Sequence, residues 1–213
     1  MAIIGIWGDS IVYGEVDASG SGWATRLRGY LSEQAEKNNS EWHHTYARGV
    51  CGDTSRNLLE RFAVEAKSIQ PDIVVLAVGI NDAAYMGSEA DVLVPTGEFE
   101  NNLRKLVIQA KSYTKKVILV GLTRVNEKLV QPYPYSSKGK SYANRTIEQY
   151  DKIIQKVALL ENLPFASVSN LILEGDLEEG LHPNSVGHQK LFQHILSLVE
   201  KVLAQVERQG LDH

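Results

Sequence analysis

The hydrophobic residues of this chain follow two patterns that alternate along the sequence. Short apolar runs are each followed by a longer segment whose apolar residues recur every three or four positions. The short apolar runs are typical of strands covered on both faces, and the recurrence every three or four positions is typical of helices with one buried face. Five strands are predicted, at residues 3–8, 43–48, 72–79, 116–122 and 164–168. The run Asp72–Gly79 is continuously apolar and β-branched, so we expect it at the centre of a sheet.

Helices are predicted between and after these strands. Their expected positions are residues 23–31, a helix capped by Asp53 or Thr54 that passes through residues 58–66, then 97–113, 142–162 and 186–206, with a frayed tail over 208–213. Strands that alternate with helices indicate βαβ units with right-handed crossovers. The sequence therefore predicts an α/β fold: a three-layer α/β/α sandwich around a five-stranded parallel sheet.

The longest segment with neither a strand pattern nor a helix pattern is residues 123–141, which contains Pro132, Tyr133, Pro134 and Tyr135. Irregular segments of this length are usually functional or disordered. The tyrosines favour a lid or wall over a site, and a solvated insertion is the alternative.

Size and charge limit the class of protein. A chain of 213 residues with 43% hydrophobic and 23% charged residues predicts a single globular domain over residues 1–213. A net charge of −4 argues against a nucleic acid as the main partner. No apolar stretch is long enough for a membrane span, the chain opens without a signal-peptide pattern, and Cys51 is its single cysteine. A cytoplasmic protein is the expectation.

Four polar clusters fall in loops that this topology gathers along one edge. They are Gly8-Asp9-Ser10, Gly49–Thr54, Gly79-Ile80-Asn81-Asp82 and Glu178–Asn184. Ligand sites of parallel sheets lie beyond the carboxyl ends of the strands, so we expect these clusters to share a site.

The clusters contain the parts that acyl transfer needs. Ser10 can act as a nucleophile if a base such as His182 lies beside it. Glycine N–H groups near Gly52 and the side-chain amide of Asn81 can stabilise an oxyanion. Each residue also has an ordinary structural interpretation: Ser10 as the cap of a helix starting at Ile11, Gly52 and Asn81 as turn formers, and His182 as a loop histidine.

The order of these residues resembles the GDSL or SGNH hydrolase family, whose four blocks carry a serine, a glycine, an asparagine and a histidine. The resemblance spans Gly8 to Asn184. It implies the flavodoxin-like fold of that family, with Ser10 as the nucleophile and His182 as the base. It also implies an oxyanion hole made of Ser10, Gly52 and Asn81.

The sequence departs from the family pattern at two positions. Ile11 stands where the family name has leucine, which is a conservative exchange. Glu179 stands where the family has an aspartate three residues before the histidine. Glutamate can orient a catalytic histidine, so Glu179 is the expected acid, with Glu178 and Asp176 as rivals.

Other polar residues are interpreted as structural. Asp9, Asp53 and Asp82 are expected to accept hydrogen bonds within their loops, and Cys51 to be a small packed residue. His188 and His194 are expected on the surface of the last helix, at a spacing that does not stack them. No metal and no organic cofactor is implied.

These observations predict a serine esterase with a small-molecule ester substrate. The polarity of segments 14–22 and 133–142, which are expected to line the pocket, favours a short acyl group, such as acetyl, on a polar alcohol or sugar. A thioesterase or lysophospholipase of the same family is an alternative, and so is a non-catalytic flavodoxin-like module that binds a small molecule.

Two other enzyme classes lack their motifs. Val12 occupies the last position of a G-x-S-x-G elbow around Ser10, which argues against an α/β-hydrolase. Pro134 stands where a P-loop ending at Gly139-Lys140-Ser141 requires its first glycine.

Overall fold

Five parallel strands form the central sheet of this protein, as the apolar runs predict. The computed structural model describes residues 1–211, with side chains described up to residue 206. The strands are β1 (Ile3–Gly8), β2 (His44–Gly49), β3 (Ile73–Ala77), β6 (Val117–Val120) and β8 (Phe165–Ala166). Their order is β2-β1-β3-β6-β8, so the strand predicted at the centre is central.

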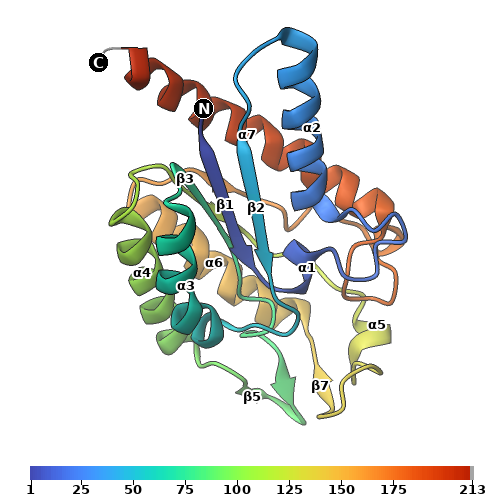
Figure 1. Cartoon of the computed structure of the whole chain (residues 1–213). Coiled ribbons are helices and arrows are strands. Elements are labelled where there is room, and N and C mark those ends of the chain that lie inside the picture. The colour runs from blue at the N-terminus through green and yellow to red at the C-terminus, as the bar shows by residue number, and fades with distance from the viewer. Residues whose placement is uncertain (212–213) are drawn as a thin grey trace.

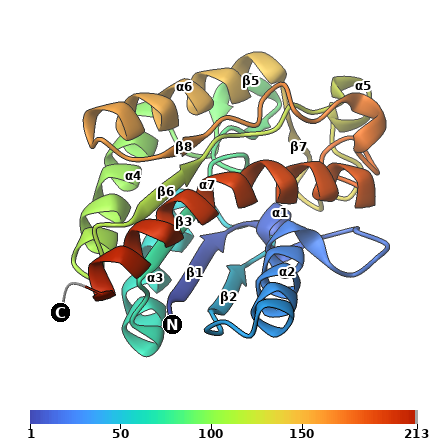
Figure 2. The same cartoon turned by 90° about the horizontal axis from the view of Figure 1, so that it is seen from above.

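Helices cover both faces of the sheet, which confirms the three-layer α/β/α sandwich. Helices α3 (Ser55–Ile69), α4 (Thr96–Lys111) and α6 (Asn144–Leu160) pack on one face. Helices α2 (Gly22–Asn38) and α7 (Ser185–Leu211) pack on the other face (Figures 1 and 2). The sheet is therefore covered on both faces, and its strands can be apolar throughout.

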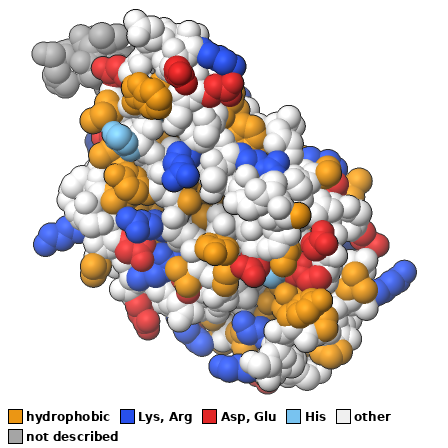
Figure 3. Space-filling view, turned by 45° about the vertical axis from the view of Figure 1, so that its right-hand side comes forward, with side chains coloured by type: hydrophobic (Ala, Val, Ile, Leu, Met, Phe, Trp, Pro, Cys, Tyr) orange, Lys and Arg blue, Asp and Glu red, His pale blue; other side chains and the backbone are white. Residues whose placement is uncertain are grey.

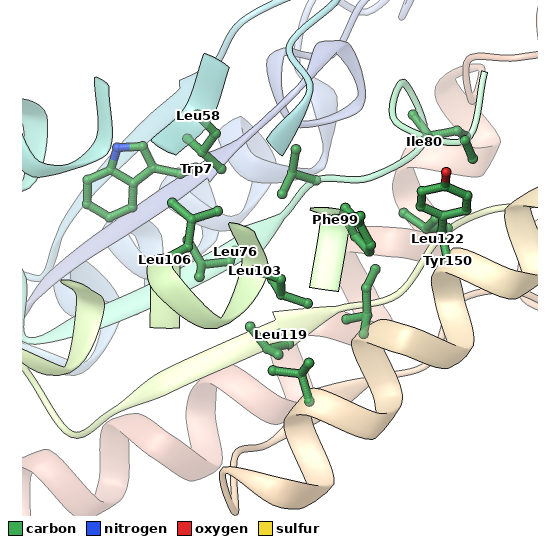
Figure 4. Close-up of a cluster of buried hydrophobic side chains, with 14 of the residues drawn as sticks. Trp7, Leu58, Leu76, Ile80, Phe99, Leu103, Leu106, Leu119, Leu122 and Tyr150 are labelled. Carbon is green, nitrogen blue, oxygen red and sulfur yellow. The ribbon is translucent and has the colours of Figure 1, made fainter. Parts of the chain in front are cut away.

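Successive residues of β1 point to opposite layers. Trp7 packs among Leu58 and other side chains on the α3 face, with its ring centroid 4.7 Å from that of Phe62 (Figure 4). Ile4 and Ile6 belong to the buried cluster of the α2 and α7 face. This period of two fixes the register of β1 between the two cores.

The chain turns sharply where β1 ends. The short helix α1 (Ser10–Tyr13) starts directly after the strand, and its N-cap is Asp9, whose Oδ1 accepts from the N–H of Ile11 at 3.0 Å. The interpretation of Ser10 as a helix cap is therefore wrong, because Asp9 takes that role. A Cβ on Gly8 would lie 2.2 Å from the carbonyl oxygen of Ala77, so only glycine fits before this turn.

A second, smaller sheet lies at the carboxyl end of the main sheet and was not predicted. Its antiparallel strands are β5 (Ser88–Val92), β4 (Tyr85–Met86) and β7 (Lys140–Ser141), in that order (Figure 1). Together with the short helix α5 (Glu127–Val130), β7 gives residues 123–141 more regular structure than expected. A 3₁₀ turn, η1 (Glu174–Asp176), lies in the polar loop before α7.

The last helix is longer than predicted. Helix α7 runs to Leu211, past the predicted end at residue 206, so the expected tail begins inside the helix, and residues 212 and 213 lie outside the described part. Among residues 1–211, no helix is long and apolar enough to cross a membrane.

Candidate active site

Ser10 and His182 meet although 172 positions separate them. Ser10 is the first residue of α1, and His182 lies in the loop between η1 and α7. His182 Nε2 lies 2.8 Å from Ser10 Oγ, and both side chains are buried. Hydrogen-bond contact between a serine hydroxyl and an imidazole is the geometry that activates a serine nucleophile.

The other ring nitrogen of His182 contacts Glu179. Nδ1 forms a short hydrogen bond with Glu179 Oε1, and the backbone N–H of His182 donates to Glu179 Oε2 at 3.3 Å. Gly180 lets the loop close between the two residues: its φ is +95°, and an added Cβ would lie 2.7 Å from the Cβ of Leu129. The loop is tied to the neighbouring segment by the N–H of Asn126, which donates to the carbonyl of Gly180 at 2.8 Å.

The two rival acids point elsewhere. Asp176 accepts from Lys190 Nζ at 2.6 Å and from the N–H of Leu173 at 2.8 Å. The side chain of Glu178 is exposed, while its backbone N–H donates to the carbonyl of His182 at 2.9 Å. Of the three acids, Glu179 is the one whose carboxylate contacts the imidazole.

Tyr133 also binds Glu179, a contact that the sequence did not predict. Its hydroxyl donates to Glu179 Oε1 at 3.0 Å, and its ring lies edge-on to His182 with 6.3 Å between centroids. Burial alone would raise the pKa of Glu179, but the hydrogen bond and charge of His182 and the bond from Tyr133 outweigh it and lower this pKa. Glu179 is therefore ionised at neutral pH. Burial and the neighbouring Glu179 raise the pKa of Tyr133, which keeps its hydroxyl a donor.

Gly52 and Asn81 line the same pocket as Ser10 and His182. Asn81 Oδ1 accepts from the Tyr142 hydroxyl at 3.1 Å, and its Nδ2 donates to the carbonyl of Asp53 at 3.1 Å. These two bonds fix the orientation of the amide, and its second N–H remains for a ligand. Gly52 has a φ of +84°, a conformation that favours glycine.

Three aspartates stabilise the surrounding loops, as expected. Burial raises the pKa of Asp9 to about 7, although the bond from Ile11 and the nearby His182 oppose the rise. Asp82 accepts from the N–H and the hydroxyl of Ser55, and burial raises its pKa to about 6. Asp53 accepts from Arg61 Nε at 2.7 Å.

Arg61 is a structural residue that no sequence pattern indicated. Besides Asp53, it donates to Glu65 Oε2 at 2.8 Å and to the carbonyls of Gly8 and Arg48 at 3.0 and 2.9 Å. It thereby ties the ends of β1 and β2 to α3, and it supports the loops that carry Ser10 and Gly52.

Two side chains lie where they were not expected. Cys51 is an exposed residue in the pocket lining, and its Sγ donates to Glu15 Oε2 at 3.2 Å. Partial desolvation of the thiol and this bond raise its pKa to about 12. His188 is fully buried between α7 and α2, where its Nδ1 accepts from the N–H of Trp23 at 3.3 Å. Burial lowers the pKa of His188 to about 4, so this ring is neutral. His194 lies on the exposed side, as predicted.

Ser10 and His182 open into a pocket of about 430 Å³. The segment from Tyr133 to Tyr142 lines it, as predicted. From segment 14–22, Glu15 lines it, whereas Gly14, Val16 and Gly20 line a separate hollow against α2 and β2. The prediction for segment 14–22 is therefore largely wrong, because the loop turns toward the edge of the sheet.

Comparison with known proteins gives consistent results. The sequence profile of the GDSL-like Lipase/Acylhydrolase family matches residues 6–190. The chain is 26% identical to an acetylxylan esterase from Geobacillus stearothermophilus over 163 residues, which are 70% of this chain and 68% of that protein. It is also 26% identical to the isoamyl acetate-hydrolyzing esterase of Saccharomyces cerevisiae over 177 residues, 78% of this chain and 73% of that protein.

Solved structures share the fold. A lipase/acylhydrolase from Enterococcus faecalis superposes with a TM-score of 0.73 at 24% identity, covering 94% of this chain and 96% of that one. The acetylxylan esterase from Geobacillus stearothermophilus gives a TM-score of 0.70 at 23% identity, with 92% and 93% covered. Fold and sequence together define a carboxylic ester hydrolase. The chain belongs to the GDSL-like lipase/acylhydrolase family.

Proposed function

We propose that this protein is a serine esterase that works through an acyl-enzyme intermediate. Ser10 is the nucleophile, His182 the general base and acid, and Glu179 the acid that orients the imidazole. The observation that supports this most strongly is the unbroken hydrogen-bonded line from Ser10 Oγ through both nitrogens of His182 to the Glu179 carboxylate. This line has the order of partners of a serine hydrolase triad.

In the first step, His182 Nε2 takes the proton from Ser10 Oγ as that oxygen bonds to the ester carbonyl carbon. The carbonyl oxygen becomes an oxyanion, held by the N–H groups of Ser10 and Gly52 and by the Asn81 amide. When the C–O bond to the alcohol breaks, His182 gives its proton to the alcohol oxygen. Water then attacks the acyl group by the same steps in reverse, and Ser10 regains its proton.

The substrate we favour is an ester of a short acyl group with a polar alcohol. Both curated relatives above are named for the hydrolysis of acetate esters. The pocket beside Ser10 is lined by Ser136, Lys138, Lys140 and tyrosines, a polar wall that suits a polar alcohol better than a long lipid chain. A binding module without turnover would gain nothing from the contact between Ser10 and His182, so the esterase is preferred.

Replacing Ser10 with alanine tests the nucleophile. Hydrolysis of para-nitrophenyl acetate should fall by at least about 10³-fold, and labelling by a fluorophosphonate should disappear. Ser197→Ala is the matched control, because Ser197 is exposed on α7 and its hydroxyl bonds to the carbonyl of His194. Label on another residue, or full activity in Ser10→Ala, would contradict the assignment.

A series of para-nitrophenyl esters from acetate to palmitate tests the acyl preference. We expect kcat/KM to be highest for acetate and to decline as the chain lengthens. A rise in kcat/KM toward palmitate would support the lipase-like or lysophospholipase alternative instead.

A further inference from the structure

Two lysines stand in the wall of the pocket that holds Ser10 and His182. Lys138 and Lys140 belong to the segment from Gln131 to Tyr142, which folds back on itself: the N–H of Tyr133 donates to the carbonyl of Lys140 at 2.8 Å. Ser136 Oγ accepts from the N–H groups of Lys138 and Lys140 at 3.3 and 3.0 Å. The backbone therefore holds both lysines at the pocket.

Within the described side chains, residues 1–206, neither ammonium group forms an ion pair. Other lysines do, such as Lys111 with Glu161 and Lys190 with Asp176, each at 2.6 Å. Lys140 is half-buried, and burial and the neighbouring Lys138 both lower its pKa. No carboxylate offsets these two effects, so the pair is a local positive charge without a counter-ion.

Basic side chains outnumber acidic ones among the residues that line the pocket. Glu15 is its acidic member, and its carboxylate accepts from Cys51 Sγ. Among the residues that line the pocket, two ammonium groups face one carboxylate, in a protein whose formal net charge is −4. The ionised Glu179 is not part of this lining, and its carboxylate is bound by His182 and Tyr133. An anion bound at Lys140 would gain attraction that is stronger than in bulk water, because Lys140 is half-buried, whereas Lys138 is exposed.

The geometry of the triad indicates which part of the ester meets this wall. In the proposed mechanism His182 protonates the departing alcohol, so the alcohol must lie on the histidine side of Ser10. Tyr133, whose ring is 6.3 Å from that of His182 and whose hydroxyl bonds to Glu179, lies opposite Lys140 in the folded segment. Lys140 is thus on the side of the leaving group, and Lys138, two residues before it, lines the same pocket.

We propose that the alcohol part of the natural ester carries an anionic group, a carboxylate or a phosphate, that Lys138 and Lys140 bind. This inference rests on the proposed esterase function and names the substrate class of the same site. The acyl group remains short and uncharged, and the anionic alcohol is the first product released.

The test compares two acetate esters of equal size, para-acetoxybenzoate and para-acetoxybenzamide, which differ in one negative charge. For the wild type, kcat/KM should favour the benzoate by about five- to tenfold at low salt, and high salt should reduce this preference. Lys138→Gln/Lys140→Gln should bring the ratio near one, and Lys140→Glu should reverse it. Because both esters are measured on the same sample, the ratio does not depend on the folded fraction.

Lys128→Gln is the matched control, since Lys128 is exposed on α5 and outside the pocket lining; its ratio should equal that of wild type. A third arm, para-acetoxyphenyl phosphate, separates a phosphate preference from a carboxylate preference. A fourth arm places the carboxylate on the acyl part, as in the mono-para-nitrophenyl ester of glutaric acid against para-nitrophenyl pentanoate. A preference on the acyl arm alone would overturn the proposal.

Different outcomes would contradict the proposed esterase function and the anionic-alcohol proposal. If Ser10→Ala hydrolyses the esters as wild type does, the proposed esterase mechanism fails. If hydrolysis depends on Ser10 while the benzoate is not preferred, or its preference survives Lys138→Gln/Lys140→Gln, the anionic-alcohol proposal alone is overturned.

Discussion

At the scale of single residues, the carboxylate behind His182 depends on more than sequence spacing. Glutamate has one methylene more than aspartate, and its longer side chain has more rotamers to restrict. In this protein Glu179 receives three donors: the His182 ring, the His182 backbone N–H and the Tyr133 hydroxyl. Tyr133 therefore acts as a positioning residue that restricts the longer acid to one orientation.

Tyr133→Phe should lower kcat for para-nitrophenyl acetate about tenfold with a smaller change in KM, because Glu179 loses a donor but the imidazole stays in place. The bond from Tyr133 lowers the pKa of Glu179. Its loss should raise that pKa and move the acid limb of the pH–rate profile to higher pH. Rates measured across the acid range would show this shift.

Tyr30→Phe is the matched control for this substitution. Tyr30 also donates its hydroxyl to a carboxylate, Glu200 Oε1, at 3.2 Å, but this pair joins α2 to α7 away from the pocket. Its pH–rate profile should match wild type. An unshifted acid limb in Tyr133→Phe would show that Tyr133 has only a packing role.

Topology and the family resemblance predicted that Ser10 meets His182, and residue spacing predicted Glu179 as the acid, but neither predicted the contact between Tyr133 and Glu179. Glu179 is three positions from His182, so one loop turn can join them. Tyr133 is 46 positions from Glu179, and no local pattern links the two. Cys51 was assigned to the interior on residue type, whereas the turn at Gly52 directs it outward.

At the scale of elements, continuous apolar character marked the inner strands of the sheet, while the edge strand β2 was predicted although it is mostly exposed. β1, β3 and β6 are buried on both faces, and burial leaves a run in the sequence. β4 and β7 have two residues each, and β5 is mostly exposed, so neither length nor periodicity marks them. Their pairing arises from the tertiary fold around the pocket.

The contact between α7 and α2 gives a test at this scale. His188→Leu removes the acceptor of the Trp23 N–H and should reduce the free energy of unfolding by about 1–3 kcal/mol at neutral pH. His188 has a folded pKa of about 4, below the ordinary histidine value of 6.5, so only the unfolded chain gains a proton between these values. Wild type therefore loses stability as pH falls through this window, and His188→Leu lacks that loss.

Urea unfolding at about pH 7 and about pH 5 should show the gap between wild type and His188→Leu narrowing at the lower pH. His194→Leu is the control on the same helix, because His194 is exposed. A gap of constant size at both pH values would mean that His188 titrates normally.

At the scale of the whole molecule, the sequence predicted the layers and the edge where the polar clusters meet. Both follow from topology, since parallel strands bring their carboxyl ends to one edge. The surface charge distribution could not be predicted in this way. Basic and acidic side chains are interspersed on the face in Figure 3, and the unpaired lysines of the pocket depend on how one loop folds back.

Buried aspartates at this edge of the sheet also make the free energy of unfolding depend on pH. Asp9 has a folded pKa of about 7, above the ordinary aspartate value of 3.8, so between these values the folded state holds a proton that the unfolded chain has lost. Stability must then fall as pH rises through this window, by at most about 4 kcal/mol from this group. Asp82, with a pKa of about 6, adds to the same trend.

Asp9→Asn should keep the acceptor for the Ile11 N–H and remove the ionisation. Its free energy of unfolding should therefore rise relative to wild type from about pH 4 to about pH 7 and then stay level, as urea titrations at several pH values would show. Asp17→Asn gives the opposite sign. Burial disfavours the Asp17 carboxylate, but bonds from Ser19 and Arg26 lower its pKa to about 2, so wild type gains stability as pH rises from about 2 to about 4. Asp17→Asn lacks this gain, and its stability relative to wild type falls over the same range. A pH-independent difference between Asp9→Asn and wild type would show that Asp9 is ionised in the fold, as an ordinary helix cap is.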